Sequence, residues 1–187
     1  MTAMSDEPSL KGQVLIASPS IFDPNFRQAV VLIAEHDESG AMGVILNRPS
    51  QASVGDVAPT LTELPGLEDT VYVGGPVEET SLIVLAQFDE PAAAALTVMG
   101  DIGFVAVGAG LDEVADTIRR ARAFAGHSGW AAGQLELELE REDWIVEPAS
   151  YDDVFAPRAR ELWPAVLQRK GGRFAVLARI PFDPSVN

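Results

Sequence analysis

The sequence predicts an α+β fold with largely antiparallel sheets and two or three helices. Short apolar runs follow one another along the chain with turn residues between them, which is the pattern of strands joined by hairpins. Helical periodicity is confined to a few segments, so the regular strand–helix alternation of a parallel sheet is missing. With 187 residues, of which 47% are hydrophobic, we expect one domain over residues 1–187, with residues 1–10 disordered.

The first half of the chain carries the clearest strand signals. An apolar run at 13–17 predicts a buried strand, and Asp23 followed by Pro24 predicts one helical turn. The runs 29–34 and 41–46 are joined by polar residues ending in Ser39-Gly40, which predicts a hairpin. Both runs are almost continuously apolar, so we expect this hairpin to be covered on both faces.

The rest of the chain predicts both strands and helices. A short helix is expected at 54–58, before Pro59. Leu111, Val114, Ala115 and Ile118 have helical spacing, and Arg119, Arg120 and Arg122 would then lie in the last turn, with Gly126 as the C-cap. Pro157 is expected to open a helix that Pro164 kinks or splits. Further strands are expected at 71–73, 81–88, 102–107, 134–140, 144–146 and 174–180, with 134–140 and 144–146 forming a second hairpin.

Composition limits the classes of function. The formal net charge is −15, so a polyanion such as DNA would be repelled, and we expect no direct nucleic-acid binding. There is no cysteine, which excludes disulfides and thiolate sites. The N-terminal residues lack the apolar stretch of a secretory signal, and the run at 29–34 is far shorter than the roughly 20 residues that cross a bilayer. We therefore expect a cytoplasmic protein that does not enter a membrane.

Several motifs allow a chemical and a structural interpretation. His127-Ser128 invites comparison with a nucleophile elbow, but Trp130 stands where the elbow needs glycine. Gly108-Ala109-Gly110 resembles the start of a dinucleotide-binding turn, but Glu113 replaces the third glycine. The basic residues Arg119, Arg120, Arg122, Arg169, Lys170 and Arg173 are either one basic face or solvated helix ends.

The stretch from Glu35 to Pro49 is the most informative. It places the chargeable residues Glu35, His36 and Asp37 at the end of a buried hairpin and closes with Asn47-Arg48-Pro49. His36 with its acidic neighbours is either a metal site or a hydrogen-bonded histidine beside solvated acids, and a pH-sensing role is open for either His36 or His127.

The ordered set of such segments resembles the AlgH/YqgE family of bacterial proteins. The resemblance spans roughly residues 12–148, and its segments are 12–19, 23–26, 30–36, 40–49, 71–77 and 129–136. It implies a compact α+β fold of several coiled sheets with a small barrel-like part. The resemblance implies no established activity or cofactor. It suggests a link to transcriptional regulation, which we expect to be indirect because the chain is too acidic for direct DNA binding. His127-Ser128 departs from the Tyr-Ala that the family usually carries.

Our leading hypothesis is a non-enzymatic protein that binds a protein partner or a small ligand, without a cofactor, a metal ion or catalytic residues. Arginine binds carboxylate or phosphate, amides donate and accept, and tryptophan anchors interfaces. The predicted binding residues, expected to meet in one exposed recess, are Glu35, His36, Asn47, Arg48, Gly74, Gly75, Pro76, Trp130 and Gln134. The alternative is a small hydrolase or metal-dependent enzyme that uses His36 with Glu35 or Asp37.

Overall fold

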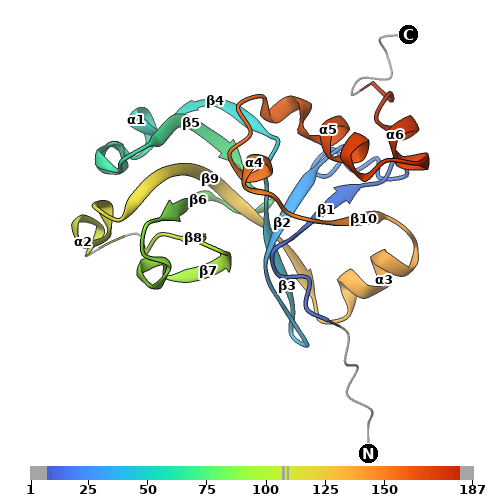
Figure 1. Ribbon diagram of the computed structural model, residues 1–187, viewed down its shortest axis with the longest axis horizontal. Coiled ribbons are helices and arrows are strands. Elements are labelled where there is room, and N and C mark those ends of the chain that lie inside the picture. The colour runs from blue at the N-terminus through green and yellow to red at the C-terminus, as the bar shows by residue number, and fades with distance from the viewer. Residues whose placement is uncertain (1–7, 107, 109, 182–187) are drawn as a thin grey trace, which may run out of the picture.

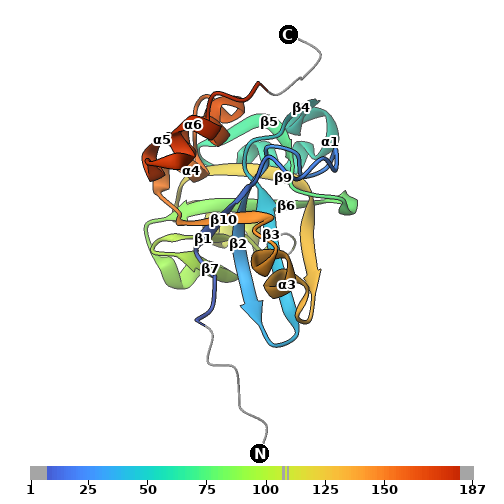
Figure 2. The ribbon, with the colours of Figure 1, turned by 90° about the vertical axis from the view of Figure 1, so that its right-hand side faces the viewer.

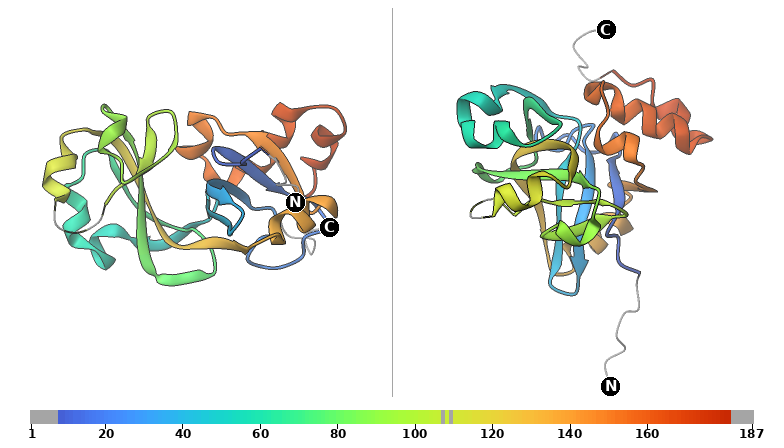
Figure 3. Two further views of the ribbon diagram at one scale, coloured as in Figure 1. Left: turned by 90° about the horizontal axis from the view of Figure 1, so that it is seen from below. Right: turned by 60° about the vertical axis from the view of Figure 1, so that its left-hand side comes forward.

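The computed structural model describes residues 8–106, 108 and 110–181, and in it one long strand, β9 (Ile118–Ala131), belongs to two sheets (Figure 1). The first part of β9 lies between β5 (Leu67–Val73) and β6 (Val77–Phe88), and its last residues pair with β3 (Gly40–Ile45). The view from below shows this strand running from one part of the molecule into the other (Figure 3).

The other elements flank these strands. The remaining strands are β1 (Gln13–Ala17), β2 (Val30–Asp37), β4 (Pro49–Ser53), β7 (Leu96–Met99), β8 (Ile102–Phe104) and β10 (Trp144–Pro148). The α-helices are α1 (Val54–Val57), α2 (Leu111–Ala115), α3 (Gln134–Glu140), α4 (Tyr151–Val154), α5 (Leu162–Lys170) and α6 (Arg173–Leu177). Short 3-10 turns cover Pro59–Glu63, Pro91–Ala93 and Ala159–Glu161.

The mixed α+β class with antiparallel sheets is confirmed. The strand order is β10-β1-β2-β3-β9-β6-β8-β7, with β4 and β5 beside β9, and among the described strands every pairing except β5 with β9 is antiparallel. The path ends at β10 and β7, so the sheet is not closed, and the expected barrel-like part is an open, coiled sheet. The described residues also form more α-helices than the two or three expected. Four of them, α1, α2, α4 and α6, are only four or five residues long, which is too short for a clear periodic signal in the sequence.

The β2–β3 hairpin forms as predicted, and its sheet is covered on both faces. Side chains alternate along a strand, so Ile16 and Leu32 pack with Trp163 of α5 on one face. Leu15 and Ile33 pack on the other face, in a cluster that includes Leu135 of α3 and the two indoles of Trp130 and Trp144. Figure 2 shows α3 in front of β3, and Figure 1 shows α5 and α6 on the opposite side of β1 and β10.

The helix predicted from Leu111 is wrong beyond Ala115. It ends there, Thr117 donates its hydroxyl to the Val114 carbonyl at 2.6 Å, and β9 begins at Ile118. The helical spacing is overridden because residues 118–125 bury apolar side chains between two neighbouring strands, which a lone helix could not do. Gly126 is therefore no C-cap, and it lies inside β9 with a φ of 70°.

The strand predicted at 134–140 is wrong too, because this segment is helix α3. Leucine and glutamate are strong helix formers, and glutamate is poorly suited to strands. In the helix Leu135 is buried and Leu139 is half-buried, four residues apart on one face, while Leu137 is 61% exposed. The second hairpin is absent for the same reason, and β10 pairs with β1 instead.

The C-terminal part is helical. The segment predicted as a final strand, 174–180, carries helix α6. Pro164 neither kinks nor splits α5, because it lies in the first turn, where a missing N–H leaves no hydrogen bond unmade. The predicted short helix at 54–58 is confirmed as α1, with Ser53 as its N-cap.

Candidate binding recess

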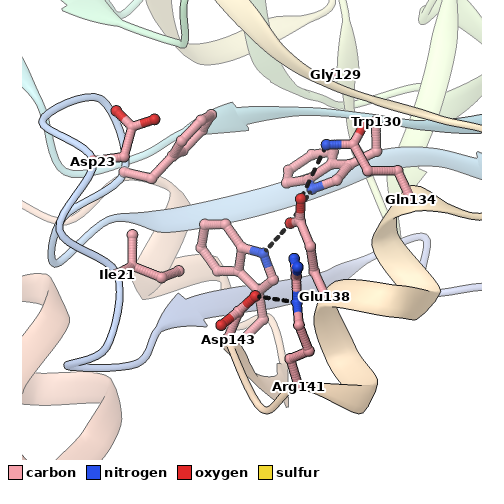
Figure 4. Close-up of a pocket in the computed structure, with 10 residues that line it drawn as sticks. Ile21, Asp23, Gly129, Trp130, Gln134, Glu138, Arg141 and Asp143 are labelled. Carbon is pink, nitrogen blue, oxygen red and sulfur yellow. Dashed lines mark hydrogen bonds and ion pairs between the residues drawn. The ribbon is translucent and has the colours of Figure 1, made fainter.

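A recess of about 240 Å³ lies between α3, the end of β9 and the loop that follows β1 (Figure 4). We call it the tryptophan recess. It is lined by Ile21, Asp23, Phe26, Gly129, Trp130, Gln134, Glu138, Arg141, Asp143 and Trp144.

The carboxylate of Glu138 is the centre of its hydrogen bonding. Its Oε2 accepts the indole N–H of Trp130 at 2.9 Å and that of Trp144 at 2.8 Å, and its Oε1 accepts the amide of Gln134 at 2.9 Å. Burial alone would raise the pKa of Glu138. The hydrogen bonds from Trp144, Gln134 and Trp130 and the charge of Arg141 together outweigh it and hold the pKa below its ordinary value. The recess therefore keeps a negative charge at neutral pH.

Aromatic rings form the apolar wall. The Trp130 and Trp144 rings meet edge to face with centroids 5.9 Å apart, and Phe26 meets Trp144 in the same way at 5.8 Å. Such T-shaped contacts are favourable because a positive ring edge meets a negative ring face. Both tryptophans are only 6% exposed, so the rings are held rigidly while part of each borders the recess.

His36 positions helix α3. Its Nδ1 accepts the backbone N–H of Leu10 at 3.0 Å, so in the neutral ring the proton is on Nε2, which donates to Glu136 Oε1 at 2.7 Å. This hydrogen bond lowers the pKa of Glu136. Ser9 donates to the His36 carbonyl as well, so two residues of the segment expected to be disordered contact β2, while residues 1–7 lie outside the described part.

Asn47 and Arg48 position the loop on the other side of the recess. Asn47 is buried, and its amide accepts from Val30 N at 2.9 Å and donates to the Gln28 carbonyl at 2.8 Å. Arg48 donates to the Arg27 carbonyl, and burial, followed by the charge of Arg160, lowers its pKa. Phe26, which lines the recess, directly precedes Arg27 and Gln28. The side chains of Asn47 and Arg48 therefore fix the backbone next to this wall of the recess.

The double-glycine bend, Gly74-Gly75, lies against the backbone of β9. The Gly74 carbonyl accepts Ile45 N at 2.9 Å and the buried Ser128 hydroxyl at 3.1 Å. A Cβ at Gly75 would lie 2.2 Å from the His127 carbonyl oxygen, so only glycine permits this contact. Ser128 is thus committed to a structural hydrogen bond, unlike the nucleophile of a hydrolase.

The predicted binding residues therefore separate into two groups. Trp130 and Gln134 line the recess. His36, Asn47, Arg48, Gly74 and Gly75 lie in the framework around it, while Glu35 and Pro76 are exposed at the surface. The Asn-Arg-Pro corner and the double-glycine bend do meet, since Val73 N donates to the Arg48 carbonyl at 2.8 Å, but they meet through backbone pairing and do not line this recess.

Two side chains of the alternative metal or catalytic site, His36 and Asp37, are engaged in other hydrogen bonds, while Glu35 is exposed. Asp37 accepts the hydroxyl and the amide of Ser39, which lower its pKa. Both ring nitrogens of His36 are occupied, and among the described residues no group of three or more His, Cys, Asp or Glu side chains is placed to hold a metal ion.

The six basic residues considered as a basic face or as solvated helix ends make contacts within the fold. Arg122 is fully buried, donates to Glu68 at 2.6 Å and to the carbonyls of Val154 and Ala156, and lies over the Tyr72 ring. The other ion pairs of this set are Arg119–Asp89, Arg169–Asp153, Lys170–Glu147 and Arg173–Glu142, and Arg120 donates to Gln87. Five of the six cations are thus paired with carboxylates, while Arg120 contacts a neutral amide and lies over the Phe155 ring.

Sequence reasoning missed most of the recess. A strand at 134–140 would turn Glu136, Glu138 and Glu140 toward solvent together. In a helix, Gln134 and Glu138 are four residues apart and therefore lie on the same face. No local pattern links Phe26 or Trp144 to this helix. In the part of the chain that the structure describes, no helix combines the length and apolar character needed to cross a membrane.

Comparison with known proteins gives a consistent result. A family model described as AlgH-like matches residues 14–175. UPF0301 proteins from Streptomyces coelicolor and Thermobifida fusca are each 39% identical to this chain, with both chains of each pair covered completely. A crystal structure of a protein from Corynebacterium diphtheriae superposes with a TM-score of 0.84 at 30% identity, covering 96% of this chain and 100% of that one. The solution structure of the AlgH protein from Pseudomonas aeruginosa gives a TM-score of 0.67 at 31% identity, covering 95% and 97%.

Proposed function

This chain belongs to the AlgH-like family, and we propose that it is a non-enzymatic protein that binds a protein partner or a small ligand in the tryptophan recess. The observation that carries this proposal is the rigid pairing of two indoles on one carboxylate at the border of an open hollow. Rigid, partly buried aromatic side chains are the usual anchors of recognition sites, because little conformational entropy is lost when they bind.

The surrounding framework supports the same proposal. His36 positions one wall of the recess through Glu136, and Asn47 and Arg48 position the loop that forms another. A preformed site binds without the free-energy cost of ordering its own walls. Any effect on transcription would pass through the partner, because the chain is strongly acidic and several of its basic side chains pair internally with carboxylates.

The test compares two substitutions of the same kind on two exposed helix positions. Gln134→Arg places a long cationic side chain at the recess and keeps a donor for Glu138, whereas Gln168→Arg places it on α5, away from the recess. Extract of the native cell is passed over each immobilised protein, and the eluates are analysed by mass spectrometry for proteins and for small molecules.

We expect one species to be retained by the wild type and by Gln168→Arg and to be lost from Gln134→Arg. Equal retention by all three proteins would remove the recess from the binding site. Far-ultraviolet circular dichroism of the three proteins provides the control for folding.

A further inference from the structure

We propose that the tryptophan recess takes an organic cation, namely an alkylammonium or alkylguanidinium group such as the end of a lysine or arginine side chain. This inference rests on the proposed function, because it names the chemistry of the occupant of the same site. Four properties of the recess support it, and they concern its charge, its free hydrogen-bonding capacity, its aromatic surface and its size.

The charge of the recess is negative. Asp23, Glu138 and Asp143 contribute three carboxylates, against the single guanidinium of Arg141. Arg141 is already paired, since its Nε lies 3.1 Å from Asp143 Oδ2. The whole chain, with these residues included, has a formal charge of −15, so the long-range field also attracts cations and repels anions.

The free hydrogen-bonding capacity is mainly on the acceptor side. An indole has one donor, and the donors of Trp130 and Trp144 are both used on Glu138. An ionised carboxylate can accept about four hydrogen bonds, and Glu138 accepts three within the protein. Asp23 uses one oxygen for Asn25 N at 2.8 Å and leaves the other to a ligand. An anionic ligand would find few donors here, whereas an ammonium or guanidinium group brings several.

The aromatic surface suits the same group. With the indole N–H groups turned to Glu138, the part of each indole that borders the recess is ring carbon. A cation over the face of tryptophan is attracted by the ring quadrupole. The alkyl stem of the ligand would contact the apolar parts of Phe26 and Ile21.

The size limits the occupant to a small group. About 240 Å³ is less than the roughly 300–1,000 Å³ of pockets that hold drug-sized ligands. A single side chain or a small amine fits this volume, and a nucleotide cofactor does not.

The test uses three small probes that share a four-carbon chain and differ in charge: n-butylammonium, 1-butanol and butyrate. The observable is the indole N–H resonance of each tryptophan in ¹⁵N-labelled full-length protein. Trp163 is the internal control, because its indole N–H donates to the Ala17 carbonyl at 2.9 Å in the core and does not border the recess.

We expect n-butylammonium to shift the Trp130 and Trp144 signals in a saturable way and to leave Trp163 unchanged, and we expect 1-butanol and butyrate to cause no such shift. Two charge variants test the cause. Asp23→Asn should weaken n-butylammonium binding and Arg141→Gln should strengthen it, each by roughly 1.5- to 5-fold, the range of exposed charge pairs.

The outcomes separate this inference from the proposed function. Three results would contradict a cationic occupant: equal shifts with all three probes, no shift with n-butylammonium, or an n-butylammonium affinity that is the same in the wild type, Asp23→Asn and Arg141→Gln. The recess would still be the binding site if Gln134→Arg alone loses the captured species. An acetylated, amidated Ala-Lys-Ala peptide then gives the source of the cation. Binding at least about tenfold tighter than n-butylammonium, a gain of 1.4 kcal/mol, indicates a protein side chain, and similar binding indicates a free amine.

Discussion

Glu138 shows at the level of one residue how a single carboxylate holds two tryptophans and helix α3 together. Its carboxylate accepts three hydrogen bonds, and two of the donors belong to tryptophans that are only 6% exposed. A buried donor that loses its acceptor retains the full cost of leaving water. Glu140, two residues along the same helix, is exposed and provides a natural comparison.

Replacing Glu138 with Ala should lower the free energy of unfolding by about 2–4 kcal/mol, because both indole N–H groups lose a charged acceptor. Glu140→Ala should change it by less than about 0.5 kcal/mol, as is usual at exposed positions. Urea denaturation followed by tryptophan fluorescence measures both. Similar losses in the two variants would show that the indole–carboxylate contacts contribute little.

The depressed pKa of Glu138 also predicts a pH dependence. A carboxyl group whose pKa is lower in the folded state contributes stability that is fully present above its unfolded pKa of about 4.3 and is lost as the pH falls through the folded value. The difference in unfolding free energy between wild type and Glu138→Gln should therefore be constant near neutral pH and shrink below about pH 4. Urea denaturation across this range measures it, and a difference that stays constant to about pH 3 would contradict the assignment.

At the level of elements, β9 connects the two sheets, and its glycines make the connection possible. Gly126 has a φ of 70°, and a Cβ there would lie 2.5 Å from the Gly75 carbonyl oxygen. Gly133, before α3, has a similar φ of 74°, but a Cβ added there would meet no atom of the described residues within 4 Å. A side chain at Gly133 would therefore cause backbone strain alone, whereas a side chain at Gly126 would cause backbone strain and a steric clash.

Gly133→Ala should cost about 1–2 kcal/mol of unfolding free energy, the penalty for a left-handed backbone with a side chain. Gly126→Ala should cost about 1–3 kcal/mol more, because the β9 and β5–β6 backbones must also move apart. Urea denaturation of both variants and of the wild type measures these differences in unfolding free energy. If the two cost the same, the close approach of Gly75 to β9 is not a constraint.

At the level of the whole molecule, charge governs which partners can approach. The formal charge of −15 is combined with basic side chains that already pair with carboxylates, such as Arg122 with Glu68 and Arg169 with Asp153. Counterion release, which drives binding to DNA, needs unpaired basic residues on one face. We therefore expect such a molecule to attract cationic ligands and basic partner surfaces.

We therefore expect no complex with duplex DNA in a gel-shift experiment at an ionic strength of about 0.01 M, where electrostatic attraction reaches furthest. A basic DNA-binding domain of similar size provides the positive control. A retarded band that disappears as salt is added would contradict the acidic character assigned to the surface.

The sequence by itself determined the central strands and the mixed class. Residues 30–34 and 41–46 are almost continuously apolar, and a run of that kind is stable as a strand only when both of its faces are covered. The turn at Ser39-Gly40 is local, so the β2–β3 hairpin could be predicted from neighbours in the chain.

Only the tertiary structure decided β9, α3, α6 and the recess. The helical spacing that starts at Leu111 continues to Ile118, the first residue of β9, and the segment of α3 alternates like a strand. In both places the local period and the final structure disagree, and the burial offered by other elements decided the outcome. The recess joins Phe26, Trp130, Glu138 and Trp144, and the bonds between them exist only once α3 is a helix packed against β9. Contacts between residues distant in the sequence depend on this packing, and no local pattern records it.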